Sequence, residues 1–239
     1  MKRNVLGIKI ESLTFSEAIN KIDLLIVNKK PSQIVTVNPE FIILAHKDPE
    51  FNKILNNADL SVPDGFGLIL AGKFLNQPFK ERVTGVDLTW AVCKLAEDRG
   101  YKVFFLGGKT GVALETSQRI KKLHPRLKIA GAYSGSPTDK RVYELIKKSK
   151  PDILFVAFGA PKQEKFIAEL KNNDIYVPLS VGVGGTFDYI AGIYPYAPLW
   201  MRKTGLEWLF RLFTQPFRFN RIITATIRFP WAVLRSKLF

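Results

Sequence analysis

Short apolar runs alternate with amphipathic stretches over most of the chain. The apolar runs predict strands at Val5–Ile10, Gln33–Val37, Leu60–Val62, Val103–Leu106, Leu127–Tyr133, Ile153–Phe158 and Val177–Val183. The intervening stretches repeat apolar positions every three or four residues, which predicts helices. These helices cover 14–28, Glu40–Asn56, Phe66–Phe74, Val86–Arg99, Gly111–His124, Lys140–Ser149 and Lys162–Asn172.

This alternation is typical of an α/β fold with a mainly parallel, Rossmann-like sheet and helices on both faces. In such folds ligands bind beyond the carboxyl ends of the strands. The polar and glycine-rich segments of this chain follow predicted strands, so we expect the functional site at that edge of the sheet.

The pattern changes near residue 195, where a basic segment rich in aromatic side chains begins. We therefore predict an α/β core at 1–194 and a short helical appendage at 195–239. Pro216 and Pro230 lack the amide hydrogen needed inside a helix, so we expect two or three short helices.

Arginines recur in this appendage at a nearly helical spacing. On one continuous helix they would share an arc of roughly 120°; they are Arg211, Arg218, Arg221, Arg228 and Arg235. A basic, apolar segment of this kind favours contact with anionic lipid or with a phosphate-bearing ligand.

Charge and composition narrow the range of possible functions. The net charge of +15 over 239 residues implies an anionic partner. With one cysteine, Cys93, and two histidines, His46 and His124, an intramolecular disulfide is ruled out and a zinc cluster is disfavoured. No uncharged apolar run approaches bilayer-spanning length, so we expect a soluble or peripheral protein on the cytoplasmic side.

Two segments place short polar side chains after predicted strands. Thr36 and Asn38 precede a helix and are suited to sugar or nucleotide binding, although Asn-Pro-Glu is also an ordinary helix start. Asp64 lies in Pro-Asp-Gly, where it is well placed for acid–base chemistry or forms a common turn. The pattern alone leaves both alternatives open.

Further candidates lie at predicted helix starts. Arg82 precedes the helix at 86–99 and suits a phosphate site or an ordinary surface position. Gln163 lies in the first turn of its helix, where side chains bind sugar hydroxyls or cap the helix. The glycine-rich turns at Gly107, Gly108 and Gly184 match neither the P-loop nor the dinucleotide fingerprint.

No Asp-x-Asp occurs in the sequence, so the paired-carboxylate metal site of many nucleotide-sugar enzymes is missing. We expect no metal and no cofactor. The charge of a leaving group would have to be met by arginine and backbone amides.

Taken together and in order, these segments resemble the WecG/TagA/CpsF family of bacterial glycosyltransferases (glycosyltransferase family 26), and most closely its TagA-like N-acetylmannosaminyltransferases. The resemblance spans nearly the whole chain. It rests on the segments at 36–40, 63–65, 82–87, 105–108, 159–164, 182–188, 197–200 and 205–212.

The resemblance implies an inverting, metal-independent transfer of a hexose from a UDP-sugar to undecaprenyl-diphosphate-linked N-acetylglucosamine, in synthesis of a surface polysaccharide or teichoic acid. It implies that Asp64 is the general base and that Thr36, Asn38, Arg82 and Gln163 hold or orient substrate. It also implies that Arg211, Arg218 and Arg221 engage diphosphate and membrane, and we expect Arg228 and Arg235 to face lipid.

One position departs from the family pattern. The family commonly has arginine before Ala-Pro-x-Trp, and here Tyr196 stands there, which leaves the exact sugar open. The net charge alone also suits a nucleic-acid-binding protein, but the excess of apolar surface in the appendage suits lipid better. A non-catalytic protein that binds anionic lipid is a further alternative, and a homo-oligomer is compatible with the sequence.

Overall fold

The computed structural model describes residues 1–238 apart from the side chains at 171 and 172; Phe239, the last residue of the predicted appendage, lies outside the described residues. Its centre is a six-stranded sheet in the order β4-β3-β8-β7-β5-β6, and every neighbouring pair is parallel. The strands are β3 (Ser32–Val37), β4 (Leu60–Pro63), β5 (Lys102–Gly107), β6 (Lys128–Tyr133), β7 (Ile153–Ala157) and β8 (Leu179–Gly182). The predicted parallel α/β fold is confirmed.

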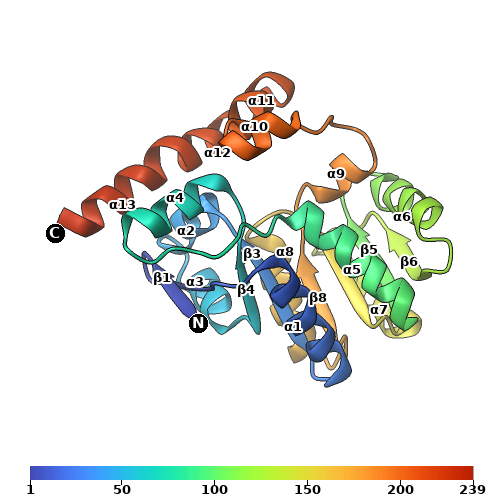
Figure 1. Ribbon diagram of the computed structural model, residues 1–239. Coiled ribbons are helices and arrows are strands. Elements are labelled where there is room, and N and C mark those ends of the chain that lie inside the picture. The colour runs from blue at the N-terminus through green and yellow to red at the C-terminus, as the bar shows by residue number, and fades with distance from the viewer. Residues whose placement is uncertain (239) are drawn as a thin grey trace.

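Helices cover both faces of this sheet (Figure 1). One face packs against α1 (Phe15–Val27), α5 (Gly85–Arg99), α6 (Val112–Leu123) and the short α9 (Thr186–Ile190). The other packs against α2 (Pro39–Ala45), α3 (Pro49–Asn57), α7 (Arg141–Ser149) and α8 (Lys162–Asn172). Successive residues of β5 and β7 enter opposite cores, so both faces of these strands are buried, as in parallel sheets generally.

The amino-terminal strand was predicted as one element, Val5–Ile10, and this is wrong. The structure has an antiparallel hairpin of β1 (Lys2–Val5) and β2 (Ile8–Glu11). Leu6 and Gly7 form the two-residue turn with φ of 52° and 84°, the left-handed values that such a turn requires. Leucine rarely adopts this conformation, and the apolar side chain of Leu6 continues the pattern of the flanking strands. The turn is therefore not apparent from the sequence.

The predicted helix Glu40–Asn56 is also divided. It forms α2 and α3 because Asp48 adopts an extended backbone before Pro49 and caps the second helix through the amide of Phe51. The other predicted core helices are confirmed within a few residues, among them α4 (Phe66–Phe74) and α1, where Thr14 and Glu17 form the predicted capping box.

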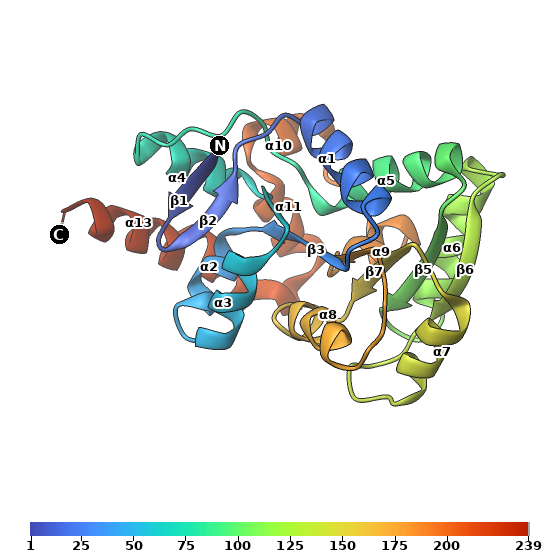
Figure 2. The same cartoon turned by 90° about the horizontal axis from the view of Figure 1, so that it is seen from below.

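The carboxyl-terminal segment forms two short helices and then a longer helical rod (Figures 1 and 2). The short helices are α10 (Leu199–Thr204) and α11 (Glu207–Thr214). The rod comprises a 3-10 turn at Pro216–Arg218, α12 (Phe219–Ile223), a π-helical turn at Thr224–Arg228 and α13 (Phe229–Leu238).

Two expectations for this segment are wrong. Pro230 does not divide the rod, because the wider π turn directly before it accommodates the interrupted hydrogen-bond ladder. The five arginines do not share one arc, because the chain turns at Gln215 between Arg211 and Arg218.

The rod packs onto the core. Phe229 and Val233 are buried among residues of α2 and α4, and the Lys237 ammonium donates to the Phe74 carbonyl at 2.8 Å. In the described part of the chain, no helix has both the length and the apolar character needed to cross a membrane.

Candidate active site

A cavity of about 110 Å³ lies beyond the carboxyl ends of β3, β4 and β8. The carboxyl-terminal segment lies over it. Its lining includes Thr36, Asn38, Asp64, Gln163, Gly184, Tyr196, Arg202, Glu207, Arg211, Arg218 and Arg221. The structure thus brings together residues that lie up to 185 positions apart in the sequence, at the edge where the site was expected.

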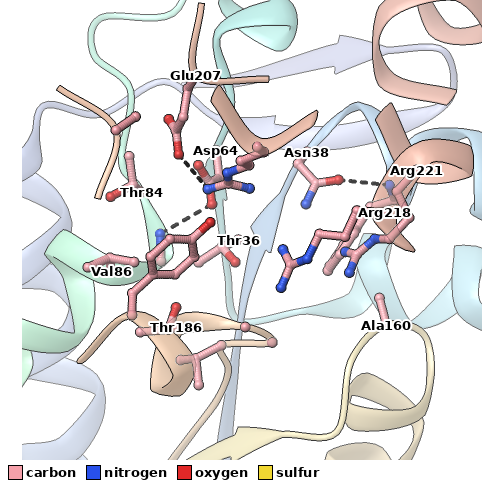
Figure 3. Close-up of a pocket in the computed structure, with 18 of the residues that line it drawn as sticks. Thr36, Asn38, Asp64, Thr84, Val86, Ala160, Thr186, Glu207, Arg218 and Arg221 are labelled. Atoms are coloured by element: carbon pink, nitrogen blue, oxygen red, sulfur yellow. Dashed lines mark hydrogen bonds and ion pairs between the residues drawn. The ribbon is translucent and has the colours of Figure 1, made fainter. Parts of the chain in front are cut away.

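Asp64 follows β4 directly and points into this cavity (Figure 3). Its Oδ2 accepts a hydrogen bond of 3.2 Å from the amide of Gly85, the first residue of α5. The next residue, Gly65, has φ of 94°, and a Cβ there would lie 3.2 Å from the Pro39 ring, so the turn is fixed by close packing. Burial, together with the charge of Glu207, raises the pKa of Asp64 to about 6.

Thr36 and Asn38 lie on either side of the end of β3 and face the same space (Figure 3). The Asn38 Oδ1 accepts from the Phe41 amide at 3.1 Å and caps α2, while its Nδ2 has no partner among the described residues. Both alternatives considered for Asn38 are therefore compatible: it starts the helix and also lines the cavity.

Three arginines of the carboxyl-terminal segment enter the cavity from two elements. Arg211 comes from α11. Arg218 and Arg221 come from the start of the rod (Figure 3). The Nε atoms of Arg211 and Arg218 are buried without a hydrogen-bond partner in the described structure. Burial, and then repulsion from Arg221, lowers the pKa of Arg218. This cluster of cationic groups is incompletely paired.

Carboxylates neutralise part of this charge. Glu207 forms ion pairs with Arg211 of its own helix and with Arg82 of the core, the latter at 3.7 Å. Arg221 pairs with Glu40 at 2.7 Å. Glu207 is the only acidic residue after Asp188 in the sequence, and it lies beside Asp64. Its position as an isolated acid among basic residues is the sequence signal that marks it.

Gln163 lines the cavity, and its side chain is held by hydrogen bonds within the protein. Its Oε1 accepts from the amides of Gly159 and Gly184 at 3.0 and 2.9 Å, and its Nε2 donates to Glu164 at 2.7 Å. These contacts join the loops after β7 and β8. Glu164 is fully buried with one carboxylate oxygen unpartnered, and burial raises its pKa to about 7.

The remaining predicted residues lie outside the cavity lining. A Cβ at Gly107 would lie 2.9 Å from the Ala157 backbone and one at Gly108 would lie 3.1 Å from Val112, so packing accounts for both glycines. Arg82 does not line the cavity, but it pairs with Glu207 and its charge lowers the pKa of Asp64. Arg228 and Arg235 are exposed on the rod.

Comparison with known proteins identifies the family to which this chain belongs. The model of the glycosyl transferase WecG/TagA/CpsF family matches residues 3–239, essentially the full length. The chain belongs to this family. It is accordingly a glycosyltransferase, and the cavity with Asp64 at its base is its candidate active site.

Three curated relatives share the name N-acetylglucosaminyldiphosphoundecaprenol N-acetyl-beta-D-mannosaminyltransferase. The protein from Bacillus spizizenii strain W23 is 36% identical over 87% of this chain and 80% of its own length. That from Bacillus subtilis strain 168 is 33% identical over 80% of this chain and 75% of its own. The protein from Staphylococcus aureus strain NCTC 8325 is 29% identical over 99% of this chain and 93% of its own.

Proposed function

We propose that this glycosyltransferase moves N-acetylmannosamine, or a closely related hexose, from a UDP-sugar to N-acetylglucosamine carried on undecaprenyl diphosphate. The name that its relatives share supports the acceptor and the sugar. Synthesis of a teichoic acid or another cell-surface polysaccharide is the process that this activity serves.

The observation that carries the proposal is the position of Asp64 beside an incompletely paired arginine cluster. A buried cation without its full set of partners is costly unless an anion occupies the site. Arg211, Arg218 and Arg221 together suit a diphosphate, which offers several charged oxygens to guanidinium groups. A carboxylate with a pKa near 6 is suited to remove a proton at neutral pH.

The reaction then proceeds as a single displacement. The acceptor hydroxyl oxygen forms a bond to the anomeric carbon, its proton passes to the Asp64 carboxylate, and the bond from that carbon to the diphosphate oxygen breaks. The arginine cluster stabilises the negative charge that develops on the departing UDP. A single displacement inverts the anomeric centre, and the chain's own residues supply both the base and the charge stabilisation.

Other residues shape the cavity around these groups. Thr36 and the free Nδ2 of Asn38 are positioned to hydrogen-bond a sugar or ribose. Gln163 acts by holding the Gly159 and Gly184 loops in place. Tyr196, where the family commonly has arginine, lines the cavity and packs 5.5 Å from the ring of Tyr189.

The carboxyl-terminal segment also presents a surface suited to a membrane. Its exposed large side chains include Trp200, Trp208, Phe213, Phe217, Phe219, Ile227, Trp231 and Leu234. Arg228 and Arg235 are interspersed on the same rod. We assign to these residues peripheral binding at the inner face of the cell membrane, where anionic lipid and a polyprenyl-linked acceptor are both present.

The test is a transfer assay with purified protein, a panel of UDP-sugars and a soluble N-acetylglucosamine-diphosphate-lipid analogue. Transfer from UDP-N-acetylmannosamine with inverted stereochemistry is expected. Transfer of a different hexose would correct the donor alone, whereas absence of transfer from every donor, with salt-sensitive nucleic-acid binding in its place, would refute the proposal.

A further inference from the structure

A second and larger cavity, of about 470 Å³, lies beside the active site. It is a groove between α4, α10 and the loop before α5. Its lining residues are Phe66, Ile69, Lys73, Phe79, Lys80, Glu81, Arg82, Leu199, Arg202 and Lys203. Its volume falls within the range of roughly 300–1,000 Å³ typical of small-molecule sites.

The wall of this groove is apolar and firmly packed. Phe66 lies against Gly205, where an added Cβ would be only 2.2 Å from the ring, and Phe79 lies against Gly72 in the same way at 2.8 Å. Ile69 and Leu199 complete the wall from α4 and α10, and Leu199 is 67% exposed. The groove therefore has one packed apolar wall and remains open to solvent.

The charges along this wall are predominantly positive. Lys80 is paired with Glu17 at 2.7 Å, and Glu81 accepts from the Phe15 amide at 2.6 Å, so these two are already engaged. Lys73 and Lys203 have no ion-pair partner among residues 1–238. Both are exposed, so the outer part of the groove carries free cationic charge.

Two arginines connect the groove with the active site. Arg202 lines both cavities, and Asp87, 3.2 Å away, is its recorded partner. Arg82 lines the groove and pairs with Glu207, which lines the active-site cavity beside Asp64. A ligand bound at these arginines would extend from the catalytic carboxylate directly into the apolar channel.

We propose that this groove binds the polyprenyl diphosphate part of the acceptor. Arg82 and Arg202 receive the diphosphate, and the first isoprenoid units lie along Phe66, Ile69, Phe79 and Leu199. This assignment rests on the proposed function, since it deepens the account of the same acceptor. An apolar wall next to Arg82 and Arg202 matches an amphiphile with one anionic head.

A binding experiment tests the groove independently of transfer. The intact protein is irradiated with farnesyl diphosphate that carries a diazirine on its first isoprene unit, and the labelled peptides are mapped. Labels are expected on the wall at 66–79 and at Leu199, and excess inorganic diphosphate should reduce them. Labels confined to the exposed aromatic residues of the rod, or no specific label, would overturn the assignment.

Kinetics with matched variants provides the second test. Ile69→Glu and Leu199→Glu place a carboxylate in the wall, and Leu70→Glu and Ile193→Glu place it on neighbouring exposed positions that do not line the groove. Two soluble acceptors are compared, N-acetylglucosamine diphosphate linked to farnesol and to methanol.

The wall variants are expected to raise KM for the farnesyl acceptor about tenfold, in line with the loss of one buried aliphatic contact. They should leave KM for the methyl acceptor unchanged, and the neighbouring variants should resemble wild type with both acceptors. Equal effects of wall and neighbouring variants, or equal effects on the two acceptors, would refute the groove assignment. Wild-type protein that uses neither acceptor would instead contradict the proposed function, while the labelling pattern would still decide the groove.

Discussion

At the scale of single residues, the site depends on the balance of charge around Asp64. Burial and Glu207 raise the pKa of this carboxyl, while the Gly85 amide, Arg211 and Arg82 lower it. Glu207 holds a central place because it pairs with an arginine from the core and with one from the carboxyl-terminal segment. The result is a pKa of about 6, close to the value that suits a general base at neutral pH.

A pH profile tests this balance. The ionised form of Asp64 accepts the proton, so kcat/KM should rise with pH and reach a plateau above about 6. Glu207→Gln removes a negative neighbour that favours the protonated form, and the midpoint should therefore move to lower pH. Glu115→Gln on α6, far from the site in sequence and fold, is the control. A midpoint in Glu207→Gln that is unchanged or moves upward would contradict the assigned role of Glu207.

The sequence indicated some residues of the site but not the interactions of others. Asp64, Thr36 and Asn38 follow strands, and the topology of a parallel sheet places such residues at one edge. The resemblance selected Arg211, Arg218 and Arg221 for the substrate, and these three line the cavity. The ion pairs of Glu207 and the burial of Glu164 depend on partners distant in the sequence, which local patterns do not encode.

At the scale of elements, errors arose where backbone geometry overrode an apolar pattern. The β1–β2 turn needs left-handed residues, and Leu6 adopts that conformation without the sequence signature for it. The rod passes through Pro230 because a π turn precedes the proline, and neither local propensity nor proline rules predict such a turn. By contrast, the long amphipathic helices and apolar strands of the core were predicted to within a few residues because tertiary packing agrees with their periodicity.

The rod is held to the core mainly through Phe229, which is 1% exposed and packs among residues of α2 and α4. Phe229→Ala removes that contact, and a buried Phe→Ala change typically costs about 3–5 kcal/mol. We expect the rod to detach more often, so that limited proteolysis cleaves within 216–238 faster while the core resists. Trp231→Ala, at a position that is 67% exposed, should be cleaved at the wild-type rate. Equal cleavage rates for both variants would show that the rod is anchored elsewhere.

At the scale of the whole molecule, the carboxyl-terminal segment has two proposed roles at different places in the fold. It lines the active-site cavity, and its exposed side chains contact the membrane. Its inner residues close over the active site and its outer residues are exposed, and the same rod carries both (Figure 1). We infer that binding at the membrane influences the position of this segment.

Vesicle binding tests the proposed membrane contact of the exposed residues on the rod. Each basic side chain near an anionic surface contributes about 1 kcal/mol, so Arg228→Ala and Arg235→Ala should each lower the partition coefficient roughly fivefold on vesicles rich in anionic lipid. Lys122→Ala, an exposed change on α6 at the opposite end of the sheet, should have no effect (Figure 1). Binding that is as strong to neutral vesicles, or insensitive to both arginine variants, would contradict the electrostatic part of the assignment.

The central claim is that Asp64 is the base of a sugar transfer whose diphosphate charge is met by the arginine cluster. The most direct measurement is turnover of Asp64→Asn with UDP-N-acetylmannosamine and the soluble lipid-linked acceptor, together with the Kd for the UDP-sugar. A lost general base predicts a fall in kcat of about 10²–10⁴-fold, with UDP-sugar affinity close to that of wild type. Turnover of Asp64→Asn at the wild-type rate would contradict the account.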